Sequence, residues 1–182
     1  MAAKSINYEI LLGEDTELAY AEIDKIKDSG NADSIKPLLE VVVHGKNRGV
    51  VESILALLSN LKHPAAIDQF LALYLSSDYE TVRADLLSVV WNSSFVDKSK
   101  VHFGSLVQIA INSDYLTSLE ALTLIENMDG PFDEADLLEG ISLCKTHLVS
   151  NPKDDKLVLV KELLAILERF DSQNTDVSLD EF

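Results

Sequence analysis

The sequence predicts an all-α protein in which antiparallel helical hairpins stack into a solenoid of about nine helices. Apolar residues recur with helical spacing through most of the chain, and clean alternation with strand spacing is absent. Short breaks rich in Gly, Pro, Asn and Asp separate the helical segments. The pattern of one pair of segments also returns further along the chain, as expected of stacked repeats.

Each predicted helix carries an apolar stripe on one face. In residues 33–43, for example, Ile35, Leu38, Leu39 and Val42 follow the i, i+3, i+4, i+7 spacing of an amphipathic helix. The stripe in residues 50–61 is wider, so we expect that helix to be buried on two sides. The predicted segments are 16–27, 33–43, 50–61, 67–75, 82–90, 103–111, 119–125, 137–148 and 157–167.

Residues that interrupt helices lie between these segments. Glycines bracket residues 45–49, and prolines follow Gly130 and Asn151. Pro64 stands near the first position of a helix, where its missing backbone N–H costs little. Helices of about 12–15 residues joined by short turns are typical of stacked hairpins.

An internal repeat organises the chain. A shift of 32 residues places the apolar residues of 38–42 on those of 70–74. A shift of 36 residues places the sequence Ser-Asp-Tyr-x-Thr at 77–81 on the same sequence at 113–117. We expect Asp78 and Asp114 in this turn to cap the second helix of their units. The resulting domains are a capping helix region at 1–32, a repeat array at 33–170 (units about 33–63, 64–97, 98–130 and 131–170), and a tail at 171–182.

Two segments resemble known repeat motifs. Residues Gly30 to Leu39, with Pro37 inside the first helix, are similar to the opening of a HEAT-like repeat. Residues 78–84, in which Arg83 follows Val82, resemble that family's second-helix start.

The resemblance to the HEAT-like family covers about residues 14–170. It weakens in the third unit, where Ser118-Leu119 replaces Val-Arg. It implies a right-handed α–α superhelix that serves as a scaffold, with Arg83 bridging to an acidic residue of a neighbouring unit. It implies no specific activity, because one fold supports many functions.

The charge balance excludes some classes of partner. The chain has 15 Lys and Arg against 31 Asp and Glu, a formal net charge of −16. Such a protein is repelled by phosphate backbones and anionic lipid surfaces, so we expect no nucleic-acid and no membrane partner. A single cysteine, no secretion signal and no long apolar run predict a cytoplasmic protein, with a monomer favoured.

The sequence lacks motifs for catalysis, cofactors or metals. It has no glycine-rich phosphate loop and no nucleophile elbow, and its four histidines lack metal-ligand spacing. The acidic clusters at 133–136 and 154–155 fall at predicted helix starts, where carboxylates favour the helix dipole; cation binding is the alternative. Cys144 precedes His147 by one turn, and a buried thiol is favoured over a reactive Cys–His pair. We therefore expect no enzyme, no cofactor and no metal site.

The candidate binding residues lie on the second helix of the second unit. Trp91 aligns with polar residues in the neighbouring repeats, which places it at the rim of the core. Exposed tryptophans are enriched at binding hot spots, although filling the gap between neighbouring second helices is the alternative. With Asp85 and Ser88 on the preceding turns, and Arg83 in a supporting ion pair, Trp91 marks a predicted concave surface.

The predicted function is a protein–protein interaction module or adaptor whose acidic field favours a basic partner. The alternative is a ligand-binding or protein-modification role, since some HEAT-like proteins resemble chromophore-attaching lyases; that role needs a cleft with convergent polar groups. A third class, similar to HEAT-like DNA-repair glycosylases, needs a basic groove, and this chain has the opposite charge.

The apolar stripe stops after Phe170. Residues 171–182 contain four acids and no Lys or Arg, so disorder is the expectation for this tail. Val177, Leu179 and Phe182 among those acids favour an alternative, in which the tail docks into a groove as a short peptide.

Overall fold

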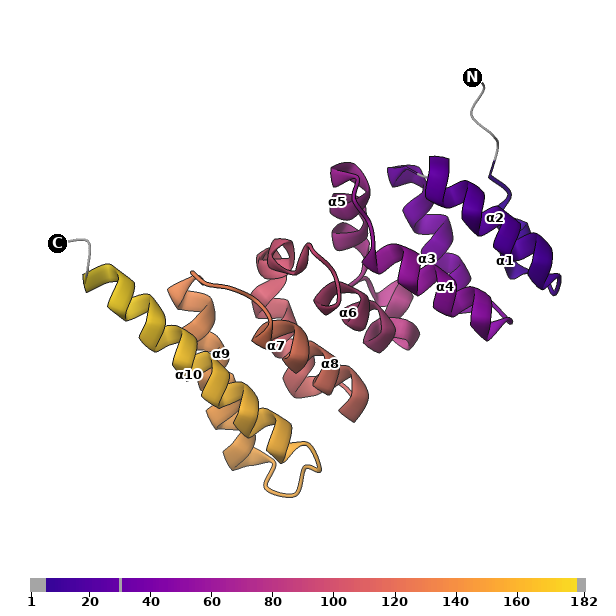
Figure 1. Ribbon diagram of the computed structural model, residues 1–182. Helices are drawn as coiled ribbons and strands as arrows, with labels where there is room; N and C mark the ends of the chain where they lie inside the picture. The colour runs from indigo at the N-terminus through magenta and orange to yellow at the C-terminus, as the bar shows by residue number, and fades with distance from the viewer. Residues whose placement is uncertain (1–5, 30, 180–182) are drawn as a thin grey trace. The chain divides into compact units, whose positions relative to one another are not determined.

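The computed structural model describes residues 6–29 and 31–179, and every regular element in these residues is a helix (Figure 1). The all-α class is therefore confirmed, and each predicted segment overlaps one of the helices α2 to α10. The α-helices are α1 (Tyr8–Leu12), α2 (Thr16–Ser29), α3 (Ile35–His44), α4 (Arg48–Ser59), α5 (Pro64–Leu73), α6 (Arg83–Trp91), α7 (Phe103–Asn112), α8 (Tyr115–Glu126), α9 (Glu134–Ser150) and α10 (Leu157–Leu179). Short 3-10 helices are η1 (Ala32–Ser34), η2 (Ser77–Val82) and η3 (Val96–His102).

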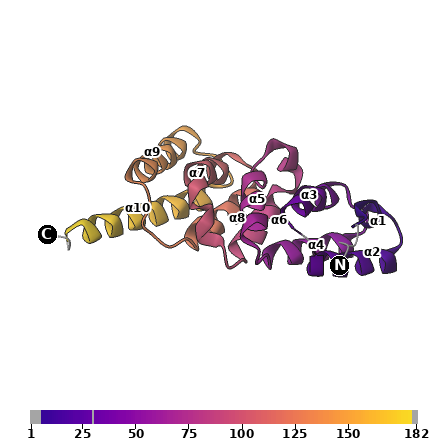
Figure 2. The same ribbon diagram turned by 90° about the horizontal axis from the view of Figure 1, so that it is seen from above.

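The chain divides into two compact units, Met1–Phe95 and Val96–Phe182. In the first unit α3 packs between α1 and α5, and α4 packs between α2 and α6. Asn47 caps α4, and its amide donates to Thr16 Oγ1 at the start of α2 (2.8 Å), so these two helices begin side by side. The unit therefore has two layers, and Figure 2 shows α1 and α3 on one side and α2 and α4 on the other.

The second unit repeats this arrangement with two hairpins. The helix α7 packs against α8 and α9, and α10 packs against α8 and α9. Gly140 on α9 lies where α9 approaches two neighbours closely. A Cβ atom there would lie 3.0 Å from Leu167 Cδ1 and 3.3 Å from Val107 Cγ1, so this contact accommodates no side chain without repacking.

Three helices, α4 and α6 of the first unit and α8 of the second, share an ending that the apolar pattern did not predict. The helices α4, α6 and α8 end at Asn60, Asn92 and Asn127, which lie 32 and 35 residues apart. Each asparagine amide donates to the carbonyl oxygen four residues earlier, at 2.8, 3.0 and 2.8 Å respectively. The side chain thus adds a donor in the last turn; the Ser88 and Thr123 carbonyl oxygens also accept from the backbone N–H groups of Asn92 and Asn127. The first interval equals the 32-residue shift of the apolar pattern, and the second is one residue shorter than its 36-residue shift.

The Ser-Asp-Tyr-x-Thr turn occurs twice and folds differently each time. Asp114 caps α8, since its Oδ1 accepts from the backbone N–H of Thr117 (3.1 Å) and its Oδ2 accepts from the Thr117 hydroxyl (2.8 Å). Asp78 instead lies inside η2, where its own backbone N–H donates to Ser76 Oγ (3.3 Å). The chain continues through η2 to Arg83 before α6 begins. The predicted cap is confirmed for Asp114 and wrong for Asp78.

This difference predicts unequal effects of the same substitution at the two sites. We expect Asp114→Ala to lower the free energy of unfolding by about 1 kcal/mol, because it removes a helix cap. Asp78→Ala should change it by less than about 0.5 kcal/mol, as at an ordinary surface site. Urea denaturation followed by far-UV circular dichroism measures both. Equal losses in the two variants would contradict the assignment of the cap to Asp114 alone.

The last helix is longer than the sequence predicted. The segment from Asp171 was expected to be disordered, but α10 continues to Leu179. Residues 180–182 lie outside the described residues, and they include Phe182 of the predicted docking peptide. The Asn174 amide donates to the Phe132 carbonyl oxygen (2.8 Å), and the Phe132 ring stacks on Phe170 with centroids 4.4 Å apart. These contacts hold the polar end of α10 against a loop 42 residues earlier, which the local pattern does not reveal.

Candidate functional site

Two open hollows lie over α4 in the first unit. The hollow between α4 and α6 has a volume of about 380 Å³, and the hollow between α2 and α4 has a volume of about 500 Å³. Ala56 on α4 lines both, so they adjoin, and we refer to them together as the α4 groove. The first is lined by Leu55, Ala56, Ser59, Asp85, Ser88, Val89 and Asn92, and the second by Lys27, Ser53, Ala56, Leu57 and Asn60.

The groove is open because its polar side chains are short and fold back onto their own helices. The hydroxyl of Ser53 donates to the Gly49 carbonyl oxygen (2.8 Å), and the hydroxyl of Ser59 donates to the Ala56 carbonyl oxygen (3.1 Å). The Asn92 amide donates to the carbonyl oxygen of Ser88 in the same way.

The charges of the groove are few. Asp85 is exposed, and no Lys, Arg or His of the described residues pairs with it. At the other end, Lys27 is neutralised by Asp24 on its own helix, with 2.9 Å between Nζ and Oδ1. The uncompensated charge is therefore the Asp85 carboxylate, which suits a Lys or Arg side chain of a partner.

The described lining of the groove places few ionisable groups near its serine hydroxyls. Ser59 and Ser88 are its hydroxyl groups in the hollow between α4 and α6, and the described lining there has neither a histidine nor a second carboxylate. A serine hydroxyl is a weak nucleophile without an adjacent base. What the arrangement offers is shape, an apolar lining of Leu55, Ala56, Leu57 and Val89, and one carboxylate.

The structure brings together only part of the predicted site. Asp85 and Ser88 line the same hollow, as their spacing on one helix implied. Trp91 is half-buried at the end of α6 and is not among the lining residues. Ser59 and Asn92 also line the groove, and they were not predicted from the sequence. Small residues at 53, 56 and 59 of an otherwise leucine-rich helix could have indicated an open face there.

Arg83 has a different role from the predicted one. Its Nη2 donates to the backbone carbonyl oxygens of Ser76 (3.2 Å) and Leu75 (3.5 Å), which follow the end of α5. Among the described residues no carboxylate lies within ion-pair distance of it, so the predicted bridge to an acidic residue is wrong. The guanidinium satisfies backbone carbonyls at the turn before η2, and carbonyls that follow a helix commonly need such donors.

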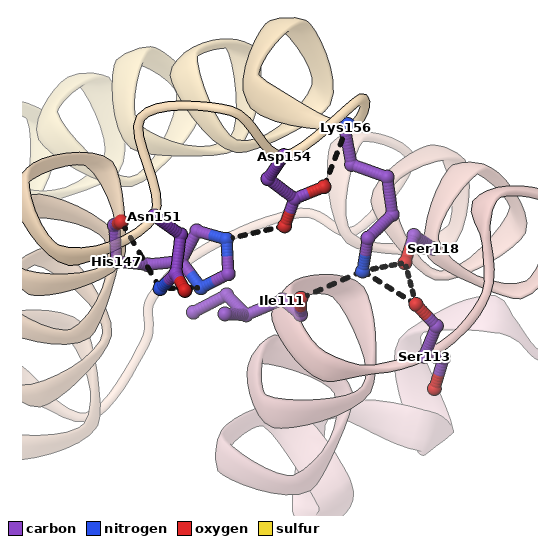
Figure 3. Close-up of polar contacts among 7 residues, drawn as sticks. All are labelled: Ile111, Ser113, Ser118, His147, Asn151, Asp154 and Lys156. Atoms are coloured by element: carbon purple, nitrogen blue, oxygen red, sulfur yellow. Dashed lines mark hydrogen bonds and ion pairs between the residues drawn. The ribbon is translucent and has the colours of Figure 1, made fainter.

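The densest polar cluster lies in the second unit, around Lys156 (Figure 3). Lys156 is 9% exposed, and its Nζ donates to the carbonyl oxygens of Ile111 (2.9 Å) and Ser113 and to Ser118 Oγ (3.5 Å). The two carbonyls lie at the C-terminal end of α7, where a cation is favoured by the helix dipole. All of the hydrogen bonds of this ammonium group are directed at the protein itself, so it fastens the α9–α10 loop to the α7–α8 turn.

A residue of the same loop, Asp154, also forms a hydrogen bond with α9. The Asp154 Oδ2 lies 2.7 Å from His147 Nε2 on α9, and its Oδ1 accepts from the Lys156 backbone N–H (2.8 Å). The pKa of the Asp154 carboxyl is lowered, first by that backbone hydrogen bond and then by the one to His147. The acidic cluster at 154–155, which was predicted from the sequence to lie at a helix start, therefore anchors the α9–α10 loop through Asp154.

The lowered pKa of Asp154 predicts a dependence of stability on pH. A carboxyl with a pKa lower in the folded chain than in the unfolded chain stabilises the fold above its unfolded value, and this contribution is lost as pH falls through the folded value. We expect Asp154→Asn to melt below the wild type at neutral pH. This difference should begin to shrink as pH falls below about 4, and it should vanish only below the still lower pKa of the folded carboxyl. Thermal melting of both proteins across this range measures the effect. A difference that persists unchanged in acid would contradict the assignment.

Cys144 is fully buried on α9, and burial is the main cause that raises the pKa of its thiol to about 11. His147 is engaged by Asp154, so the alternative of a reactive Cys–His pair is not supported. We expect iodoacetamide to modify Cys144 very slowly at pH 8 in the folded protein and rapidly in denaturing urea. Equal rates in the two conditions would show that the thiol is accessible.

Comparisons with protein-family models, with curated proteins and with solved structures find no match to this chain. Among the described helices, none is long and apolar enough to cross a membrane. The described residues also contain no group of three or more His, Cys, Asp or Glu side chains placed to share a metal ion.

Proposed function

We propose that the chain is a HEAT-like α-solenoid that works as a non-enzymatic protein-interaction module, with a basic partner docked in the α4 groove. The observation that carries this proposal is the groove itself: it is open, lined by short self-bonded side chains, and presents the unpaired Asp85 carboxylate. Grooves between parallel neighbouring helices are the binding surfaces that α-solenoids commonly use.

The repeat supports the solenoid part of the proposal. Helices of one layer follow one another in each unit, and the Asn60, Asn92 and Asn127 caps recur at nearly the interval of the apolar pattern. A chain in which each hairpin buries its apolar face on the next has this periodicity.

The charge supports the basic partner. With a net charge of −16, the protein accelerates encounter with a positively charged surface, and Asp85 provides a specific acceptor once the partner is bound. Trp91, half-buried at the end of the same helix, adds an aromatic contact next to the groove.

Affinity capture from the native host with charge-reversed bait tests the proposal. We expect Asp85→Lys to reduce recovery of the partner about tenfold or more, because it turns an attractive contact into a repulsive one. Glu80→Lys, an equal charge change at an exposed residue of η2 outside the groove, is the matched control. Retention of all captured proteins by Asp85→Lys would refute docking in the α4 groove.

A further inference from the structure

A more enclosed pocket adjoins the α4 groove in the first unit, where α2 and α4 end and α3 and α5 begin. Its volume is about 230 Å³. Its floor is apolar and includes the buried side chains of Ile26, Ile35, Leu38 and Ala66. A ligand that fills this floor must bring a hydrocarbon group, because polar groups placed there would lose their hydrogen bonds to water.

The rim of this pocket has the opposite charge to the rest of the chain. Lys27, Lys62 and His63 line it, and none of its described lining residues is acidic. Lys27 is paired with Asp24, whereas Lys62 is exposed and has no ion-pair partner among the described residues. In a protein with a net charge of −16, a rim of this kind is an exception that favours an anionic group.

The start of α5 adds a second feature that favours an anion. This helix of ten residues begins at Pro64, its N-cap is His63, and no side chain makes the capping hydrogen bond. Most helix starts gain stability from an oxygen that accepts from their first N–H groups, and the dipole favours negative charge there. Few N–H groups are free in this turn, because Pro64 has none and those of Ala66 and Ile67 donate to the His63 carbonyl oxygen (3.0 and 3.1 Å). His63 and Ala66 line the pocket, so a carboxylate at the rim lies at the positive end of the α5 dipole.

We propose that this pocket binds a small amphiphilic carboxylate, with its hydrocarbon group on the floor of Ile26, Ile35, Leu38 and Ala66 and its carboxylate between Lys62 and the start of α5. The volume is suited to an alkyl chain of medium length or a single aromatic ring. An inorganic anion leaves the floor empty, and an alkylammonium ion meets the lysines with the wrong charge. The pocket adjoins the α4 groove, with which it shares Lys27, Leu57 and Asn60. The inference does not depend on the proposed function, because Asp85 does not line the pocket and Lys62 does not line the groove.

Titration of the full chain with octanoate, octanamide and octylammonium, followed by methyl NMR, tests the proposal. We expect saturable shifts of the Ile26, Ile35 and Ala66 methyl signals with octanoate. The neutral amide should bind about tenfold more weakly, since it lacks the charge-assisted contacts at the rim. Octylammonium should not shift these signals.

Charge reversal at the rim provides the second arm. We expect Lys62→Glu to weaken octanoate binding about tenfold or more, whereas Lys36→Glu, at an exposed lysine of α3 outside the pocket, leaves it unchanged. Both sites are exposed, so both variants should keep the far-UV spectrum of the wild type. Equal affinity for the three probes, shifts away from the pocket, or no saturable octanoate binding would overturn the proposal.

Discussion

Replacing Lys156 with methionine is expected to lower the free energy of unfolding by about 3 kcal/mol. Methionine has nearly the same length as lysine but no hydrogen-bond donor. The substitution therefore leaves the Ile111 and Ser113 carbonyl oxygens, which Lys156 now satisfies, without this donor in a largely buried site. An unsatisfied buried acceptor costs about 1–3 kcal/mol, and hydrogen bonds to a charged group are stronger than neutral ones.

The gain from burying an apolar side chain offsets only part of this loss. Methionine avoids the desolvation of an ammonium group, but the vacated carbonyls remain at the C-terminal end of α7, where the cation also interacts with the helix dipole. The loss should appear as a lower urea midpoint in far-UV circular dichroism. Lys161→Met, at an exposed position of α10, is the control and should change stability by less than about 0.5 kcal/mol. A Lys156 variant as stable as this control would show that the three hydrogen bonds contribute nothing net.

Lys156 also shows where prediction from sequence stops. The apolar stripes located the helices because a helix that buries one face must repeat apolar residues every three or four positions. Lys156 directly precedes such a stripe and resembles any charged residue near a helix start. Its partners lie 38 to 45 residues earlier in the chain, so only the tertiary structure reveals that it is buried.

Physical reasons also explain why some helices were not predicted from the sequence. The helix α1 has five residues, which is too short to display a helical period, and η2 and η3 are 3-10 helices whose period differs from that of an α-helix. The end of α10 was missed because the contact of Asn174 with Phe132 is long-range.

The sequence predicts which site residues share the face of one helix, but not which residues of a neighbouring helix lie beside them. Asp85 and Ser88 follow from the spacing of the second helix, since residues three apart share a helical face. Ser59 belongs to the neighbouring helix, and its place in the groove depends on how α4 packs against α6. The Arg83 bridge, taken from a family resemblance, was wrong because the carbonyls that precede η2 are its partners.

Gly45→Ala is expected to lower the free energy of unfolding of the first unit by about 2–3 kcal/mol. Gly45 ends α3 with an ordinary φ of −64°, so backbone conformation does not require a glycine there. The lack of space requires a glycine, because a Cβ atom at this residue would lie 2.5 Å from the Val41 carbonyl oxygen and 2.8 Å from Val51 Cγ2. The Val41 oxygen also accepts the closing hydrogen bond of α3 from the Gly45 N–H (2.8 Å), so it cannot retreat without breaking that bond.

The matched substitution at Gly104 should have the opposite sign. A Cβ atom there meets nothing closer than Asp136 Oδ1 at 3.7 Å, and in the first turn of α7 we expect alanine to be favoured over glycine by up to about 0.5 kcal/mol. Far-UV circular dichroism in urea measures both variants, and the fluorescence of Trp91, which lies in the same unit as Gly45, follows that unit by itself. If Gly45→Ala were as stable as the wild type, α3 and α4 would have to separate by several tenths of an ångström at no cost. Tight packing in protein interiors argues against that, since small displacements of closely packed helices forfeit many contacts at once.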